Sequence, residues 1–149
     1  MVTSGNCKCF VCQNGIESLE DFEKTMMEKH GWYAHLVPDP SFPLGINCHT
    51  HGLDHTFNHR DLQIIFPLND KILIHLLHNC VDYIKENKHI PIEKELTGII
   101  QDYHCKFVRA QECDRDVLRM IVPDKYGNLG FDMDGVFKKQ YQDISYLYN

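Results

Sequence analysis

The sequence lacks the features that define several classes of protein. Its 15 Lys and Arg residues are spread along the chain, with no basic run longer than the pair Lys138–Lys139, and the formal net charge is -6. Proteins that bind nucleic acid through its phosphates usually carry a basic face, so nucleic acid is an unfavoured partner. No apolar run approaches the ~18 residues that indicate a membrane-spanning helix, and no membrane partner is expected.

The first residues, MVTSGNCKCFVC, lack the charged start and the apolar stretch of a secretory signal. Without export the default compartment is the cytosol, where thiols stay reduced. The seven cysteines are an odd number, so they cannot all pair within the chain. These features predict a soluble cytoplasmic protein whose cysteines are thiols or metal ligands rather than a disulfide framework.

Several catalytic and binding motifs are also missing. The sequence has no Gly-rich phosphate loop, no G-x-S-x-G elbow and no H-E-x-x-H motif. Asp132, Asp134 and Gly135 hint at a calcium loop, but the stretch is too short and no Glu closes it. The main chemical signal is therefore the 10 His and 7 Cys residues.

Hydrophobic periodicity predicts two principal helices. The first starts at Glu17, where apolar residues begin to recur at helical spacing, and is ended by Gly31. The second covers residues 70–87, with Asn69 as its cap and one apolar stripe along its length. We expect both helices to pack on the rest of the chain through these apolar faces.

Alternating or apolar segments between turn residues predict short strands. They are Trp32–Val37, Leu44–Thr50, Asp61–Phe66, part of Thr97–Ala110, and Val117–Val122. Residues 51–59 are expected to form an irregular polar connection. The sequence thus predicts one α+β domain over residues 1–149, with a small, mostly antiparallel sheet. A Cys-bearing loop (1–15) would precede it, and a polar and aromatic tail (136–149) would end it.

Cys7, Cys9 and Cys12 form a C-x-C-x2-C cluster near the start of the chain. The interval between Cys9 and Cys12 is typical of zinc knuckles, in which a tight turn directs two sulfurs at one ion. Zinc needs a further donor beyond this segment. The candidates for it lie in the middle of the chain: Cys48, His49 and His51. The alternative interpretation is a set of reduced thiols without metal.

Four histidines fall within the eleven residues from His49 to His59. In an extended strand His49 and His51 would point to the same face, which is how H-x-H pairs bind a catalytic metal. The segment is close to the H-x-H-x-D-H signature of metallo-β-lactamase-like hydrolases. However, an extra residue separates His51 from Asp54 and would rotate Asp54 away from a shared ion. Alternatively, these histidines hydrogen-bond the backbone of an irregular loop.

Three functional hypotheses follow. The first is a binding or accessory protein with structural zinc held by the N-terminal cysteines and a loop histidine. The second is a metal-dependent hydrolase that uses the His49–His59 cluster. The third is an acid–base enzyme without metal, built on His51, Asp54 and His59. Coordination distinguishes the first two, because protein ligands close a structural site whereas a catalytic site keeps a position for water.

Short motifs recur along the chain in a characteristic order. They are His30-Gly31-Trp32, Thr50-His51-Gly52-Leu53, the segment from Phe57 to Leu62 with sequence FNHRDL, and Val122-Pro123-Asp124-Lys125-Tyr126-Gly127. Together they resemble the bacterial domain-of-unknown-function family 4262, over a region from about Cys9 to Gly127. The resemblance identifies this chain as a divergent member, since His49 replaces a tyrosine of the pattern and Arg60-Asp61 replace Pro-Glu. It implies a fold but no reaction.

The resemblance also implies that the motif residues around the middle of the chain act as one local unit. Gly52 would permit a tight turn, and His59 together with Asp61 would cross-link that turn by hydrogen bonds. This role is structural rather than catalytic.

Overall fold

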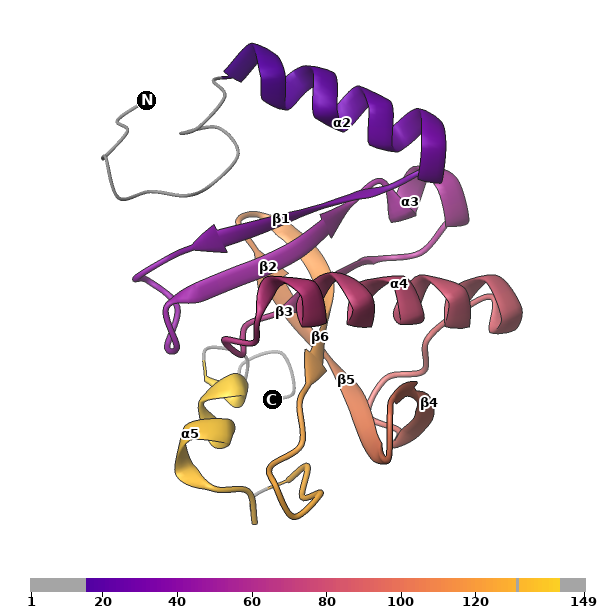
Figure 1. Cartoon of the computed structure of the whole chain (residues 1–149). Coiled ribbons are helices and arrows are strands. Elements are labelled where there is room, and N and C mark those ends of the chain that lie inside the picture. The colour runs from indigo at the N-terminus through magenta and orange to yellow at the C-terminus, as the bar shows by residue number, and fades with distance from the viewer. Residues whose placement is uncertain (1–15, 131, 143–149) are drawn as a thin grey trace.

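The computed structural model describes residues 16–130 and 132–142, with side chains from residue 20 onward in these ranges (Figure 1). A six-stranded sheet lies at the centre, in the order β1-β2-β3-β6-β5-β4. Its strands are β1 (Tyr33–Pro38), β2 (Ile46–His51), β3 (Asp61–Ile64), β4 (Leu96–Ile100), β5 (Tyr103–Glu112) and β6 (Arg115–Ile121). The helical elements are α2 (Ile16–His30), α3 (Leu53–Phe57), α4 (Asp70–Asn87), α5 (Gly135–Lys138) and the 3-10 turn η1 (Lys139–Tyr141).

The predicted α+β class is confirmed, but the sheet is mixed. Strands β3 and β6 run parallel, while the other neighbouring strands run antiparallel. The parallel pair arises because the chain leaves β3, passes through α4 and the β4–β5 hairpin, and returns beside β3 as β6. Parallel strands need such a long crossover. Local periodicity does not report a pairing of this kind, so the prediction missed it.

The description of two principal helices is also incomplete. Besides α2 and α4, the described residues contain α3 and α5. Helix α3 occupies most of the segment that we expected to be irregular. Gly52 precedes it with a φ of +97°, and a Cβ there would lie 2.7 Å from the Sδ of Met27. The turn into α3 therefore requires glycine.

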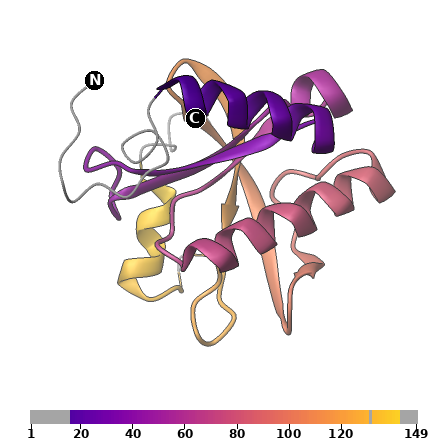
Figure 2. The same cartoon turned by 45° about the horizontal axis from the view of Figure 1, so that its top comes forward.

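Helix α4 has the predicted bounds and the predicted cap. The Oδ1 of Asn69 accepts hydrogen bonds from the backbone N–H groups of Lys71 and Ile72, at 2.8 and 3.3 Å. These bonds satisfy donors that the first helical turn leaves without partners. The apolar stripe of α4 is buried against the sheet: Leu73, Leu76, Leu77, Cys80, Val81 and Ile84. Figure 2 shows α4 lying across the sheet and α2 lying along β1.

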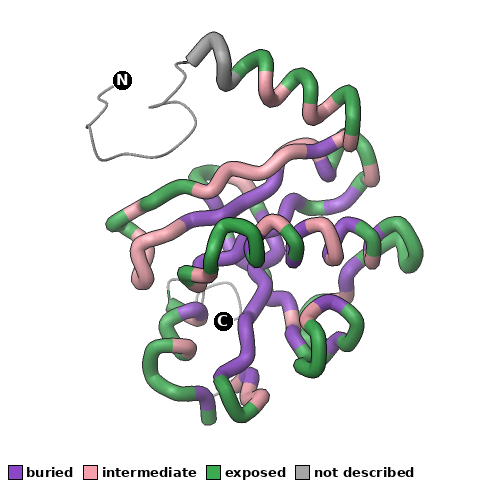
Figure 3. The backbone as a smooth tube through the Cα atoms, in the orientation of Figure 1, coloured by how far each residue is buried: buried purple, intermediate pink, exposed green. Residues whose placement is uncertain are grey.

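The two faces of the sheet are covered differently. Alternate strand residues such as Leu62, Phe107 and Met120 join α4 in the main hydrophobic core. On the opposite face, apolar residues of β5 and β6 contact Leu129 and Met133 in a smaller core. The remainder of that face carries mainly polar side chains, among them Gln63 and the histidines of β1 and β2. Figure 3 shows that β2, β3 and β6 are largely buried, whereas α2 is exposed or half-buried.

Among residues 16–130 and 132–142, no helix combines the length and the apolar character needed to cross a membrane.

Candidate metal centre

The polar face of the β1–β2 hairpin carries a cluster of three histidines. The antiparallel register places His35 of β1 opposite His49 of β2, and His51 lies two residues further along β2 on the same face. Ring centroids are 5.4 Å apart for His35 and His49, 4.7 Å for His35 and His51, and 5.0 Å for His49 and His51. One nitrogen from each ring lies within 4.8 Å of the others. Three imidazoles this close can bind one metal ion.

The H-x-H spacing correctly places His49 and His51 side by side, but sequence reasoning missed His35. The sequence does contain a signal for it. His35 lies in the predicted strand Trp32–Val37, just before the strand of His49, and its side chain is on the face opposite to that of Leu36. Finding it requires the register of the hairpin, which places His35 across from His49. In the part of the chain that the structure describes, no other set of three or more His, Cys, Asp and Glu residues meets as closely.

His49 is the most deeply buried of the three, with 4 % of its surface exposed. Burial lowers its pKa to about 4, although the neighbouring Glu112 raises it. Burial also lowers the pKa of His51 to about 4, with a further lowering by the positive charge of Arg115. Both rings are therefore neutral near pH 7. Neutral imidazole is the form that binds a metal ion.

Two carboxylates lie beside the rings. Glu23 of α2 is 2.8 Å from the Nε2 of His35, and the Oε1 of Glu112 is 3.3 Å from the Nε2 of His49. Two ligands that bind one tetrahedral zinc at ~2.0–2.1 Å lie about 3.3–3.4 Å apart. The separation between His49 and Glu112 matches this value. The carboxylate of Glu112 would therefore be within reach of an ion held by the three rings, either as a fourth ligand or as a partner of a bound water.

Arg115 fixes this carboxylate in place. Its Nε donates to the Oε2 of Glu112 at 2.8 Å, its Nη1 to the Oδ2 of Asp61 at 2.8 Å, and its Nη2 to the backbone oxygen of Thr50 at 2.7 Å. Burial raises the pKa of Glu112, but the hydrogen bond from Arg115 and the nearby His49 outweigh this and the pKa is lowered. Glu112 is thus a carboxylate at neutral pH.

The unit around Asp61 holds together the turn that follows β2. Asp61 accepts hydrogen bonds from the hydroxyl of Thr50 at 2.8 Å and from the backbone N–H of Leu53 at 3.2 Å. The same hydroxyl oxygen of Thr50 accepts from the N–H of Leu62 at 2.9 Å. These bonds join the end of β2, the start of α3 and β3. Arg115 binds to the same unit through Asp61 and Thr50, which holds its guanidinium group beside the histidines.

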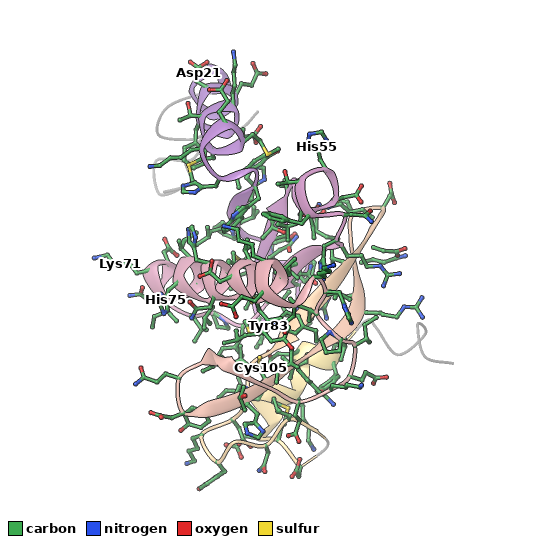
Figure 4. The ribbon with its side chains drawn as sticks, turned by 90° about the vertical axis from the view of Figure 1, so that its right-hand side faces the viewer. Asp21, His55, Lys71, His75, Tyr83 and Cys105 are labelled. Atoms are coloured by element: carbon green, nitrogen blue, oxygen red, sulfur yellow. The ribbon has the colours of Figure 1, made fainter. Side chains whose placement is uncertain are left out.

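The other candidate residues have different surroundings. Cys48 lies on the opposite face of β2, in the main core, where burial raises the pKa of its thiol to about 12. It does not approach the cluster, because adjacent strand residues alternate. Asp54 is exposed on α3, and Figure 4 shows the neighbouring His55 projecting away from the fold. Cys7, Cys9 and Cys12 lie outside the described residues.

His59 is buried and both of its ring nitrogens contact the backbone. Its Nδ1 lies 2.7 Å from the oxygen of Arg60, and its Nε2 accepts from the N–H of Ile90 at 3.0 Å. The ring thus links the start of β3 to the segment after α4. These contacts fit a structural brace. The ring binds the backbone of Ile90, whereas we expected it to bind the turn at Gly52.

These features define an α+β fold with a three-histidine cluster on one sheet face. The sequence matches the family described as Domain of unknown function (DUF4262) over residues 26–133, and the chain belongs to this family. The resemblance drawn from the motifs is therefore confirmed. No curated protein and no solved structure matches the chain significantly.

Several motif residues that carried the resemblance serve the fold. Gly31 has a φ of +79°, and a Cβ there would lie 2.6 Å from the Cγ2 of Thr56. Asp124 accepts hydrogen bonds from the N–H groups of Tyr126, Asn128 and Asp134, which closes the loop after β6.

Proposed function

We propose that this protein binds a divalent metal ion of the zinc class through His35, His49 and His51, and that this centre carries its function. The observation that supports the proposal is the approach of three ring nitrogens to within 4.8 Å of one another. Imidazole ligands suit zinc, copper, iron and nickel, whereas calcium and magnesium prefer oxygen. The low pKa of His49 and His51 favours binding, because no proton has to be displaced near pH 7.

The surroundings of the rings also support binding. A metal-binding histidine usually donates its second ring N–H to a fixed acceptor. His49 has such a neighbour, since its Nδ1 lies 3.2 Å from the Oδ1 of Asn47. We further propose that the protein acts in the cytoplasm, where the free thiols of the described residues stay reduced: Cys48, Cys80, Cys105 and Cys113.

Zinc titration followed by calorimetry tests the proposal. The wild-type protein should bind about one Zn²⁺ per chain, and His35→Ala, His49→Ala and His51→Ala should each weaken binding severely. His55→Ala is the matched control, since His55 is an exposed histidine on the nearby α3. If the three variants bind zinc as tightly as His55→Ala, the proposed site is wrong.

A metal-dependent hydrolase is the second candidate, and the position of Glu112 favours it. Three protein ligands leave one position of a tetrahedral zinc for water, whose pKa the metal lowers to about 7. The carboxylate of Glu112, 3.3 Å from the Nε2 of His49, is placed to accept a proton at that position. Arg115 holds the carboxylate in that orientation.

Glu112→Gln separates a proton acceptor from a metal ligand. With bis(p-nitrophenyl) phosphate and p-nitrophenyl acetate as probes, a general base predicts unchanged zinc affinity and a rate lowered about 10²–10⁴-fold. A ligand predicts weaker zinc binding. If wild-type protein loaded with zinc hydrolyses neither probe faster than zinc-free protein, the hydrolase candidate fails, while the binding proposal rests on the titration.

A further inference from the structure

A row of buried polar side chains leads from β6 to the metal centre. Arg119, Gln63, Asn47 and His49 are each between 0 and 5 % exposed. The row follows from the sheet register, in which His49 is aligned with Gln63 and Gln63 with Arg119. Buried polar groups are almost always hydrogen-bonded, and the direction of each bond here can be deduced.

The Nε of Arg119 lies 2.8 Å from the Oε1 of Gln63, and the Nε2 of Gln63 lies 3.0 Å from the Oδ1 of Asn47. A guanidinium group only donates. Gln63 must therefore direct its oxygen to Arg119 and its NH₂ group to Asn47. Asn47 must in turn present its oxygen, because an NH₂ group there would face the NH₂ group of Gln63.

The same oxygen of Asn47 lies 3.2 Å from the Nδ1 of His49. Since this oxygen only accepts, the Nδ1 of His49 carries the hydrogen and donates it. A neutral imidazole has a single N–H, so its Nε2 keeps a free lone pair. The Oε1 of Glu112 is a second acceptor, 3.3 Å from the Nε2, but only the contact between Nδ1 and Asn47 has hydrogen-bond geometry, so Asn47 outweighs Glu112 in holding the single ring hydrogen.

We infer that Arg119, Gln63 and Asn47 are positioning residues that hold His49 in its Nδ1–H tautomer and so direct the Nε2 lone pair to the metal. The role toward the metal rests on the proposed function, whereas the tautomer is a property of the metal-free protein. Arg119 is itself anchored, because its Nη1 donates to the backbone oxygens of Gln140 and Gln142 at 2.9 and 3.2 Å. Such outer contacts typically change metal affinity about 10–100-fold when removed.

Gln63→Glu is the decisive variant, because it reverses the direction of the hydrogen bonds along the row while the side chain keeps almost the same shape. The new carboxylate still accepts from Arg119 but cannot donate to Asn47. The amide of Asn47 should turn to offer its NH₂ group to the carboxylate, and this group then also faces the Nδ1 of His49. His49 must accept there, so its hydrogen moves to Nε2, the atom that would bind the metal.

Long-range ¹⁵N–¹H NMR of the ring nitrogens reads the tautomer directly. In metal-free protein near pH 7, wild type should show Nδ1–H at His49, and Gln63→Glu should show Nε2–H with zinc affinity lowered about 10–100-fold. Asn47→Asp is the matched control, because its carboxylate oxygens still accept from both Gln63 and His49. It should keep the wild-type tautomer.

Asn47→Leu provides a second test if Gln63→Glu fails to fold. Without an acceptor at Nδ1, the carboxylate of Glu112 beside Nε2 is the acceptor that remains, so His49 should shift toward Nε2–H. A wild-type protein with Nε2–H at His49, or a folded Gln63→Glu protein that keeps Nδ1–H, would overturn the inference. If the tautomer switches as expected but wild type binds no zinc, the positioning role in the free protein stands and the proposed function fails.

Discussion

Neighbouring residues of β2 enter two very different environments. Cys48 points into the apolar core beneath α4, whereas His49 points into the polar row that leads to Asn47 and Gln63. Both residues are buried, with 1 and 4 % of their surfaces exposed. The core is held by non-directional burial of apolar area, whereas each member of the polar row depends on the orientation of the next.

This difference predicts how the two faces respond to substitution. On the core side, the loss of stability should follow the volume removed. On the polar side, a substitution such as Gln63→Glu, which replaces one atom without loss of volume, should alter the metal affinity and the tautomer of His49. The following substitutions probe that contrast, beginning with the largest effect.

Leu77→Ala should have the largest effect on stability. Leu77 is fully buried in the stripe of α4 that packs on the sheet. Truncation of a buried leucine leaves a cavity and typically costs about 2–5 kcal/mol. Ile72→Ala is the control on the same helix, because Ile72 is 48 % exposed. Urea unfolding should show a much lower midpoint for Leu77→Ala alone, and equal midpoints would mean that the helix packs differently.

His59→Ala should have the next largest effect. Removal of the ring leaves the buried N–H of Ile90 without its acceptor, and an unsatisfied buried group costs about 1–3 kcal/mol. His55→Ala should be nearly neutral, because His55 is exposed on α3. Thermal unfolding of the two variants side by side measures the difference. Equal stability of His59→Ala and wild type would contradict the brace.

Stability should also depend on pH through His59. Burial lowers the pKa of His59 in the folded protein below its ordinary value of 6.5. The unfolded chain therefore binds a proton at His59 more readily than the folded protein does. The free energy of unfolding has its full value above pH 6.5 and falls as the pH decreases from there through the pKa of His59 in the folded protein. His59→Asn should show a shallower fall below pH 6.5 in denaturant midpoints. Parallel curves for the two proteins would indicate that His59 does not contribute.

Cys48→Ala should have the smallest effect. The substitution removes one buried sulfur from the core face and should lower stability by about 1 kcal/mol. It should leave zinc affinity unchanged, because Cys48 faces away from the histidines. A loss of zinc binding comparable to that of His49→Ala, measured by calorimetry, would show that the two faces are not independent.

The sequence predicts the helices and most of the strands because their signals are local. Apolar spacing and Asn69 define α4, and Gly31 ends α2. Strand order is not local: β3 and β6 pair in parallel although Asp61 and its partner Val117 are far apart in the chain. The short helix α3 was missed because its few residues carry mainly polar side chains, which are typical of loops.

The candidate site divides in the same way. His49 and His51 were found because a period of two within one strand brings them together. His35 was missed because it depends on hairpin register. Glu112 was missed because it lies at the far end of β5, remote from His49 in the sequence, and no local pattern relates the two residues. The N-terminal cysteine hypothesis stays a prediction, as those residues lie outside the described chain.

X-ray absorption spectroscopy at the zinc edge tests the central claim most directly. Protein loaded with an equimolar amount of Zn²⁺ should show only nitrogen and oxygen neighbours at ~2.0–2.1 Å, with the outer-shell scattering of imidazole rings. That result is the one expected for an ion on His35, His49 and His51, the ligands whose identity the alanine variants establish. Sulfur neighbours at ~2.3 Å would instead place it on the cysteines and contradict a histidine centre.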